Sequence, residues 1–72
     1  MSDVCKNRLE TIGNNVERLR KQNNISQERF AMMTGINQPQ LSRIEKGQVN
    51  VTVETLERIA KGLNCDMSAL IN

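Results

Sequence analysis

Apolar residues recur along the first third of the chain at steps of three and four, the spacing of one buried face on an α-helix. The residues that follow this pattern are Cys5, Leu9, Ile12, Val16 and Leu19. The pattern stops near Asn23 and Asn24, so it predicts one long first helix that ends there. Gly13 lowers the helical propensity inside this segment but does not end the helix.

Residues typical of helix ends divide the next part of the chain into two short helices. Ser26 precedes the segment QERFAMM and places a hydroxyl where a helix N-terminus has free backbone N–H groups, and Gly35 supplies a stop. Asn37 is a second N-cap, followed by Pro39 in a first turn, where a missing N–H costs nothing. This third helix is predicted to end just before Gly47.

The C-terminal part predicts a loop and two more helices. The polar and β-branched segment QVNV at 48–51 is predicted to be the loop, after which Thr52 caps a fourth helix. The apolar face of that helix consists of Val53, Leu56, Ile59, Ala60 and Leu63. Asp66 is predicted to cap a short fifth helix whose apolar side consists of Met67, Leu70 and Ile71. With no strand pattern anywhere, the predicted fold class is all-α with five helices.

The spacing of small and apolar residues within the second and third helices predicts a helix-turn-helix over about residues 27–45. Two helices that cross steeply need a small side chain where they nearly touch, which Ala31 provides, and a positive φ in the turn, which Gly35 adopts without strain. The underside of the second helix of the motif is then formed by Ile36, Leu41 and Ile44.

On these residues the chain resembles the Cro and phage-repressor type of helix-turn-helix regulators, from about residue 12 to residue 71. The matching motifs are RLRKQNNISQERFA, IEKG, TLERIAKGLN and SALI. The resemblance implies a compact, lambda-repressor-like DNA-binding domain over residues 1–72, with a dimerisation region in the C-terminal helices at about 53–71. The sequence departs from the family pattern at Pro39, where many relatives carry a contacting polar residue, and at QVNV, where relatives often carry basic residues.

The resemblance also implies which residues meet double-stranded DNA. Gln38 and Arg43 are the implied base readers, since an amide pairs with two edge atoms of adenine and a guanidinium pairs likewise with guanine. The other residues implied to contact bases or flanking phosphates are Gln40, Asn37 and Ser42. Phosphate contacts are implied for Gln27, Arg20, Lys46 and Asn50. Arg20 is further implied to form an ion pair with Glu45 that ties the first helix to the third.

The apolar residues of the fifth helix suggest a homodimer. So short a helix is not expected to bury three apolar side chains within its own domain, and two recognition helices must lie about 34 Å apart to enter successive major grooves. We therefore assign Met67, Leu70 and Ile71 to a symmetric dimer interface. The alternative that Leu70 and Ile71 cover the core of their own domain stays open.

Positive charge is concentrated in the middle of the chain. The formal net charge is only +2, with 10 basic and 8 acidic residues. Residues 18–46 contain six of the basic residues and two of the acidic ones, which leaves both flanks acidic. A basic segment between acidic flanks is typical of a module that meets phosphate on one face.

Several functional classes lack support in the sequence. The chain has no histidine and no glycine-rich phosphate loop, and its two cysteines, Cys5 and Cys65, lie far apart, so we expect no enzymatic activity, metal, cofactor or small-molecule ligand. It also has neither a signal-like N-terminus nor an apolar run of about 20 residues, so we expect a cytoplasmic protein with reduced cysteines and no membrane contact.

The function that the resemblance implies is sequence-specific transcriptional regulation. We expect a repressor that occupies a palindromic operator as a dimer, in the manner of phage repressors or restriction-modification controllers, and activation stays open. A protein-interaction module such as an antitoxin or adaptor is an alternative, although the third helix carries Arg43 and no acidic residue before Glu45. RNA binding is a further alternative, although Phe30 is the only aromatic residue available to stack on bases.

Overall fold

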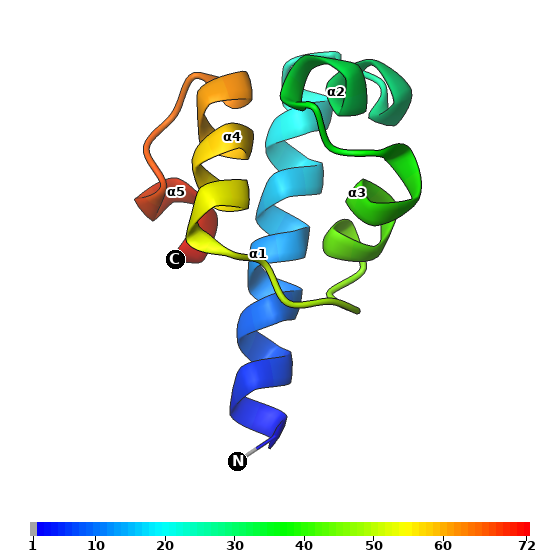
Figure 1. Ribbon diagram of the computed structural model, residues 1–72. Coiled ribbons are helices and arrows are strands. Elements are labelled where there is room, and N and C mark those ends of the chain that lie inside the picture. The colour runs from blue at the N-terminus through cyan, green and yellow to red at the C-terminus, as the bar shows by residue number, and fades with distance from the viewer. Residues whose placement is uncertain (1) are drawn as a thin grey trace.

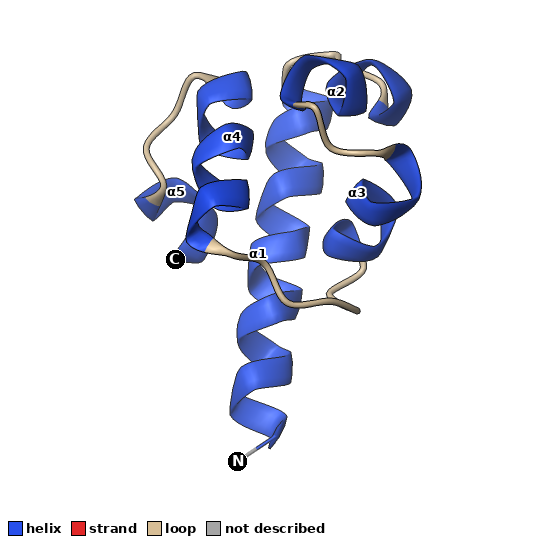
Figure 2. Ribbon diagram, in the orientation of Figure 1, coloured by secondary structure: helices blue, strands red, loops and turns tan. Residues whose placement is uncertain are grey.

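The structure, a computed structural model, describes the backbone of residues 2–72 and the side chains of residues 8–72. The described chain consists of five α-helices joined by short loops, without a strand (Figure 2). The helices are α1 (Ser2–Gln22), α2 (Gln27–Thr34), α3 (Gln38–Glu45), α4 (Val53–Leu63) and α5 (Ser68–Ile71). The predicted all-α fold with five helices is therefore confirmed. Cys5, which the sequence pattern places on the first helix, lies outside the residues whose side chains are described.

Three helices begin at the side-chain caps that the sequence predicts. The Ser26 hydroxyl accepts a hydrogen bond from the Arg29 N–H at 3.1 Å. The side-chain oxygen of Asn37 accepts one from the Gln40 N–H at 2.8 Å, and Pro39 lies in the same first turn of α3. Thr52 caps α4 in the same way. Each cap satisfies a backbone donor that the helix itself leaves unpaired, which is typically worth about 1 kcal/mol.

The predicted cap at the start of the fifth helix is wrong. The N-cap of α5 is Met67, whose side chain makes no capping bond. Asp66 takes part through its backbone instead, because its carbonyl accepts the Ala69 N–H at 3.0 Å. The carbonyl of Met67 likewise accepts the Leu70 N–H at 2.9 Å, so tight backbone bonds satisfy these donors without a side chain.

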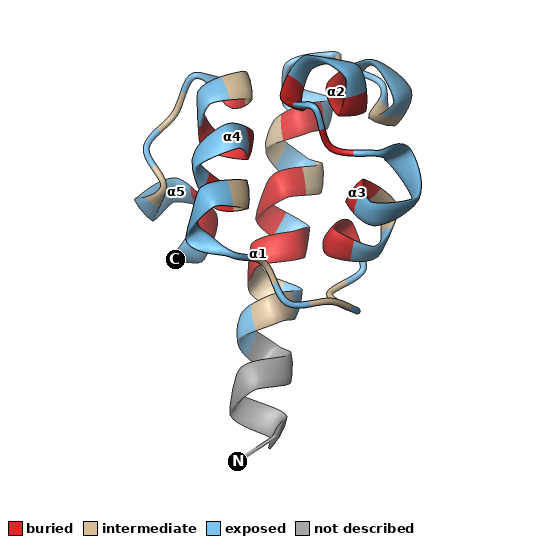
Figure 3. Cartoon of the chain, in the orientation of Figure 1, coloured by how far each residue is buried: buried red, intermediate tan, exposed pale blue. Residues whose placement is uncertain are grey.

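The core lies where the inner faces of the helices meet, as the buried segments in Figure 3 show. Its fully buried large side chains are Val16, Phe30, Leu41, Ile44, Ile59 and Leu70. The apolar stripe predicted for the fourth helix is buried from Leu56 onward, but Val53 is 63% exposed. Val53 is the first residue of α4, so the stripe extends one turn beyond the edge of the core.

The long helix α1 supports the other elements, and α2 and α3 form the predicted helix-turn-helix. α1 contacts α3, α4 and α5, while α2 packs on both α3 and α4 (Figure 1). Gly35 ends α2 with φ 74°, and its N–H donates to the carbonyl of Ala31 at 3.0 Å. Ala31 and Ile36 are buried where the two helices approach each other, as their spacing predicts.

Candidate nucleic-acid interface

The polar side of α3 faces outward because only a narrow stripe of the helix packs on the core. Leu41 and Ile44 are buried at 0% and 1% exposure, whereas Gln38, Gln40 and Arg43 are exposed. Within the described residues, the side chains of Gln38 and Arg43 have no hydrogen-bond or ion-pair partner. Their donors and acceptors are therefore available to an external molecule.

The residues at the start and middle of α3 extend this outward face. Asn37 uses its side-chain oxygen to cap the helix, so its amide NH₂ group remains as the donor for an external molecule. Ser42 is half-buried between Leu41 and Arg43. Pro39 is exposed and offers no backbone donor, so the amides of Gln38 and Gln40 supply the polar groups in this turn.

Arg20 and Glu45 form the ion pair that the resemblance implies. The Nε atom of Arg20 lies 2.7 Å from Oε2 of Glu45, and its Nη2 atom lies 3.1 Å from Oε1. The third guanidinium nitrogen, Nη1, donates to the carbonyl of Ile25 at 2.8 Å. The hydrogen bond that Arg20 donates to Glu45 raises the pKa of Arg20, so the guanidinium stays charged. The pair fixes the loop before α2 and the end of α3 to the same point of α1.

The second role implied for Arg20, a phosphate contact, does not fit the structure. Arg20 is only 7% exposed, and each of its guanidinium nitrogens already donates a hydrogen bond within the domain. A phosphate would have to displace the Glu45 carboxylate from a buried site. Arg20 therefore acts inside the domain and not at its surface.

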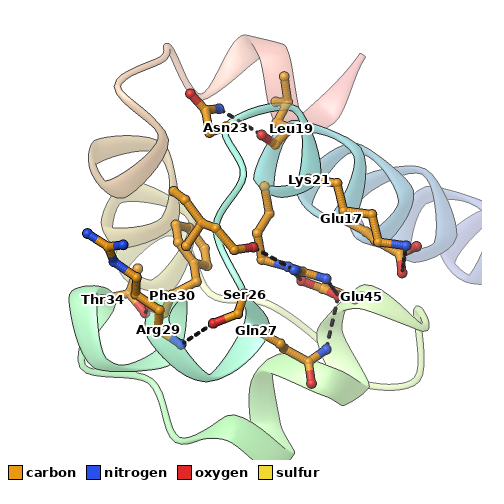
Figure 4. Close-up of polar contacts among 12 residues, drawn as sticks. Glu17, Leu19, Lys21, Asn23, Ser26, Gln27, Arg29, Phe30, Thr34 and Glu45 are labelled. Carbon is orange, nitrogen blue, oxygen red and sulfur yellow. Dashed lines mark hydrogen bonds and ion pairs between the residues drawn. The ribbon is translucent and has the colours of Figure 1, made fainter.

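Gln27 joins this ion pair in a way that the sequence does not predict. Its side-chain Nε2 donates to Oε1 of Glu45 at 3.0 Å, as Figure 4 shows. Gln27 is the first residue of α2 and is half-buried, so its amide is held in place at a helix N-terminus. The second N–H of the amide remains for an anion that approaches this end of α2.

The remaining predicted phosphate contacts lie in the segment that follows α3. Lys46 and Asn50 are both exposed there, and neither side chain has a partner among the described residues. Arg29 and Arg43 are also exposed, whereas the charge of Glu45 is neutralised by Arg20. The outer surface of the helix-turn-helix is therefore basic, with Glu28 as its one exposed acidic residue among positions 27–46.

The C-terminal helix places the three predicted interface residues in three different environments. Leu70 is fully buried in the core of its own domain, so it is not available to a partner. Met67 is half-buried against the same core, and Ile71 is 37% exposed. The position of α5 is fixed by Asn15, a buried residue that the sequence analysis does not single out. Its Nδ2 donates to the carbonyl of Leu70 at 2.7 Å.

The chemistry of the described residues offers no metal site. No group of three or more histidine, cysteine, aspartate and glutamate side chains lies close enough to hold an ion in this part of the chain. The same helices also lack any segment with the length and apolarity that crossing a bilayer requires.

Cys65 is half-buried, and burial raises the pKa of its thiol, with a further increase from the neighbouring carboxylate of Asp66. Because the thiolate is the reactive form, we expect alkylation by iodoacetamide at neutral pH to be slower than in a short peptide with the same neighbouring residues. The difference should shrink as pH rises above the ordinary cysteine pKa of about 8.5. Mass spectrometry of the Cys65 fragment measures the rate, and equal rates in both contexts at neutral pH would contradict this expectation.

Comparisons with known proteins agree with this geometry. Residues 16–70 match the helix-turn-helix family HTH_3. Control protein C.SmaI of Serratia marcescens is 34% identical over 71 residues, which cover 97% of this chain and 84% of that protein. Control protein C.MunI of a Mycoplasma species is 38% identical over 61 residues, or 83% of this chain and 82% of the relative.

Two solved structures have the same fold. The restriction-modification controller protein C.AhdI from Aeromonas hydrophila superposes with a TM-score of 0.83 at 27% identity, covering 86% of this chain and 94% of that one. An HTH_3 family transcriptional regulator from Vibrio cholerae gives 0.87 at 33% identity, covering 92% of this chain and 37% of that one. The chain therefore belongs to the HTH_3 helix-turn-helix family of DNA-binding transcriptional regulators.

Proposed function

We propose that this DNA-binding regulator recognises a two-fold symmetric operator as a homodimer and reads its sequence through α3. The observation that carries the proposal is the outward face of α3, where Gln38 and Arg43 have no partner within the described chain while Leu41 and Ile44 hold the helix in the core. An α-helix of this kind fits the major groove, where amide and guanidinium groups distinguish base pairs.

Within this proposal the polar side chains divide into base contacts and backbone contacts. Gln38 and Arg43 read base edges, while Gln40, Asn37 and Ser42 contact bases or phosphates beside them. Phosphate contacts carry no sequence information of their own, and here they are made by Gln27, Lys46 and Asn50. The bond from Gln27 to Glu45 supports its place in this set, since it orients the amide at the N-terminus of α2.

The likeness to control proteins favours one biological setting. C.SmaI and C.MunI are named control proteins, and C.AhdI is described as a restriction-modification controller. We therefore place this chain among the controllers of restriction-modification genes, working in the cytoplasm on the promoter of such genes. Repression then needs only an operator that overlaps the promoter.

The dimer is assigned to the exposed part of α5. Leu70 is excluded by its burial, which leaves Ile71 and the outer side of Met67 as the apolar contacts. A two-fold axis near this helix would relate two copies of α3, each of which reads one half-site.

Replacing Ile71 with lysine is expected to weaken self-association, because a charged side chain would enter an apolar two-fold contact twice. Sedimentation at micromolar concentration measures the effect. The matched control is Ala69→Lys, which adds the same charge at an exposed position of the same helix, on another side from Ile71. Wild-type association in Ile71→Lys would place the interface elsewhere, and a wild-type chain that stays monomeric on operator DNA would rule out the dimer.

Selection of bound sites from random duplexes tests the operator. We expect a two-fold symmetric consensus whose half-sites are centred about one helical turn, or about 34 Å, apart. Competition with single-stranded DNA and with RNA of the same sequence serves as the control. An asymmetric consensus, or equal competition by RNA, would contradict the proposal.

A further inference from the structure

The recognition helix α3 is held at its C-terminal end by a backbone contact with α1 that depends on Gly13. Gly13 is buried in the domain and lies near the middle of α1. A Cβ atom at this position would lie 2.4 Å from the carbonyl oxygen of Ile44 and 2.6 Å from that of Glu45. Both oxygens belong to the backbone at the end of α3, so no side-chain rotation could make room for a methyl group.

The opposite side of the contact also carries a glycine. Gly47 follows α3 with φ 71°, and a Cβ atom there would lie 2.9 Å from the Cα atom of Glu10. Glu10 precedes Gly13 by three residues and so lies on the same side of α1. The backbone of α1 over residues 10–13 is thus in direct contact with the end of α3 and the two residues that follow it, over residues 44–47.

Gly13 and Arg20 fix the same residue of α3 in two different ways. They are seven residues apart, which places them on one face of α1, two turns from each other. Arg20 binds the side chain of Glu45, whereas Gly13 admits its backbone. Arg43, the proposed guanine reader, lies two residues before Glu45 on the same short helix. Any displacement of the helix end therefore moves Arg43.

We infer that Gly13 is a positioning residue for base recognition: it sets how closely α3 lies to α1 and thereby where Arg43 meets the base edge. This inference rests on the proposed base reading by α3. A methyl group at position 13 would have to increase the 2.4 Å separation to at least 3.0 Å, since shorter Cβ contacts essentially do not occur in proteins. A shift of 0.6 Å or more exceeds the tolerance of about 0.5 Å within which a binding geometry must be held.

The cost that the chain accepts at this position supports the same inference. Glycine inside a helix is about 1 kcal/mol less favourable than alanine. Gly13 lies inside the 21-residue helix α1, where alanine would favour the helix more. The contact with α3 explains the absence of a side chain at position 13, since the three atoms nearest to an added Cβ all belong to the backbone of Ile44 and Glu45.

The test compares affinities of Gly13→Ala and the wild type for the selected operator and for a scrambled duplex. We expect Gly13→Ala to bind the operator about tenfold more weakly, the loss of one imperfect base contact, while binding to the scrambled duplex changes less than twofold. The matched control is Gly62→Ala in α4, whose added methyl group would have side-chain atoms of Phe30 and Thr34 as its nearest neighbours, at 3.0 and 3.1 Å. It perturbs packing without touching α3, so its ratio of the two affinities should stay as in the wild type.

A second variant covers the case in which Gly13→Ala does not fold. Gly47→Asn keeps a residue that tolerates positive φ, and its Cβ contact of 2.9 Å is less severe than the one at position 13. We expect it to reduce the same affinity ratio, but by less. A wild-type ratio in a folded Gly13→Ala, or in Gly47→Asn if Gly13→Ala is unfolded, overturns the inference. If Arg43→Ala leaves the base preference unchanged, the proposal that Arg43 reads a base is wrong, and this outcome is distinguishable from a failure of the inference about Gly13.

Discussion

Replacing Arg43 with alanine is expected to lower affinity for the preferred operator by about 1 to 3 kcal/mol and to remove discrimination at one base position in each half-site. The structure supports this expectation because the guanidinium is exposed and has no partner within the described chain. A guanidinium can donate two hydrogen bonds to the pair of acceptors on a guanine edge, and the other bases present no such pair in the major groove. Non-specific affinity should therefore fall much less than operator affinity.

Lys46→Ala is the matched control, since it also removes one exposed positive charge close to the end of α3. A phosphate contact carries no sequence information, so this variant should weaken all duplexes about equally and reduce the salt slope by about 0.9. Binding profiles of both variants on the same random-duplex pool provide the measurement. Arg43 would be assigned to phosphate if its removal reduced the salt slope and left the base preferences intact. Gln38→Ala, measured in parallel, should lose discrimination at a neighbouring position.

Glu45→Gln is expected to lower the free energy of unfolding by about 3 kcal/mol, because it leaves the buried Arg20 guanidinium without its counter-charge. The side chains of Arg20 and Glu45 are only 8% and 3% exposed, so water cannot replace the lost carboxylate. The bond from Gln27 to Oε1 would be weakened by the same change. Chemical denaturation gives the free energy directly.

Two comparisons separate the ion pair from a general effect of removing a negative charge. Glu57→Gln makes the same chemical change at an exposed position of α4 and should alter stability by less than about 0.5 kcal/mol. Replacing both partners with apolar residues, Arg20→Met with Glu45→Leu, should recover much of the loss, since no buried charge then remains. Equal destabilisation by Glu45→Gln and Glu57→Gln would show that the pair contributes little.

The features predicted correctly from the sequence are those that one segment encodes by itself. The caps at Ser26, Asn37 and Thr52 and the turn at Gly35 depend on a few neighbouring residues, and all four lie as predicted. Residue periodicity likewise identifies the inward side of a helix. The ion pair of Arg20 with Glu45 links distant segments, and only the family resemblance predicts it.

The features that were missed or wrongly predicted depend on the position of a second segment that is distant in the sequence. Val53 belongs to the apolar stripe of α4, but the stripe gives no sign that the core begins only one turn later, at Leu56. Gln27 reaches Glu45 across 18 positions, which no spacing rule indicates. For Asn15 a signal was present, since this polar residue adjoins the apolar Val16 on the inward side of α1. Its partner, a backbone carbonyl, leaves no trace in the sequence.

The hydrogen bonds of Asn15 bear on how the domain folds. This side chain joins α1 to the carbonyls of Leu70 and Asn72, across 55 and 57 positions of the chain. α5 has four residues, far fewer than an isolated helix needs in water, so it exists only where α1 already offers Asn15 and the surface that receives Leu70. Closing so long a loop costs chain entropy that is recovered only when the final contacts form. Docking of α5 therefore requires a folded α1, and the shortest of the described helices closes a loop of 55 positions.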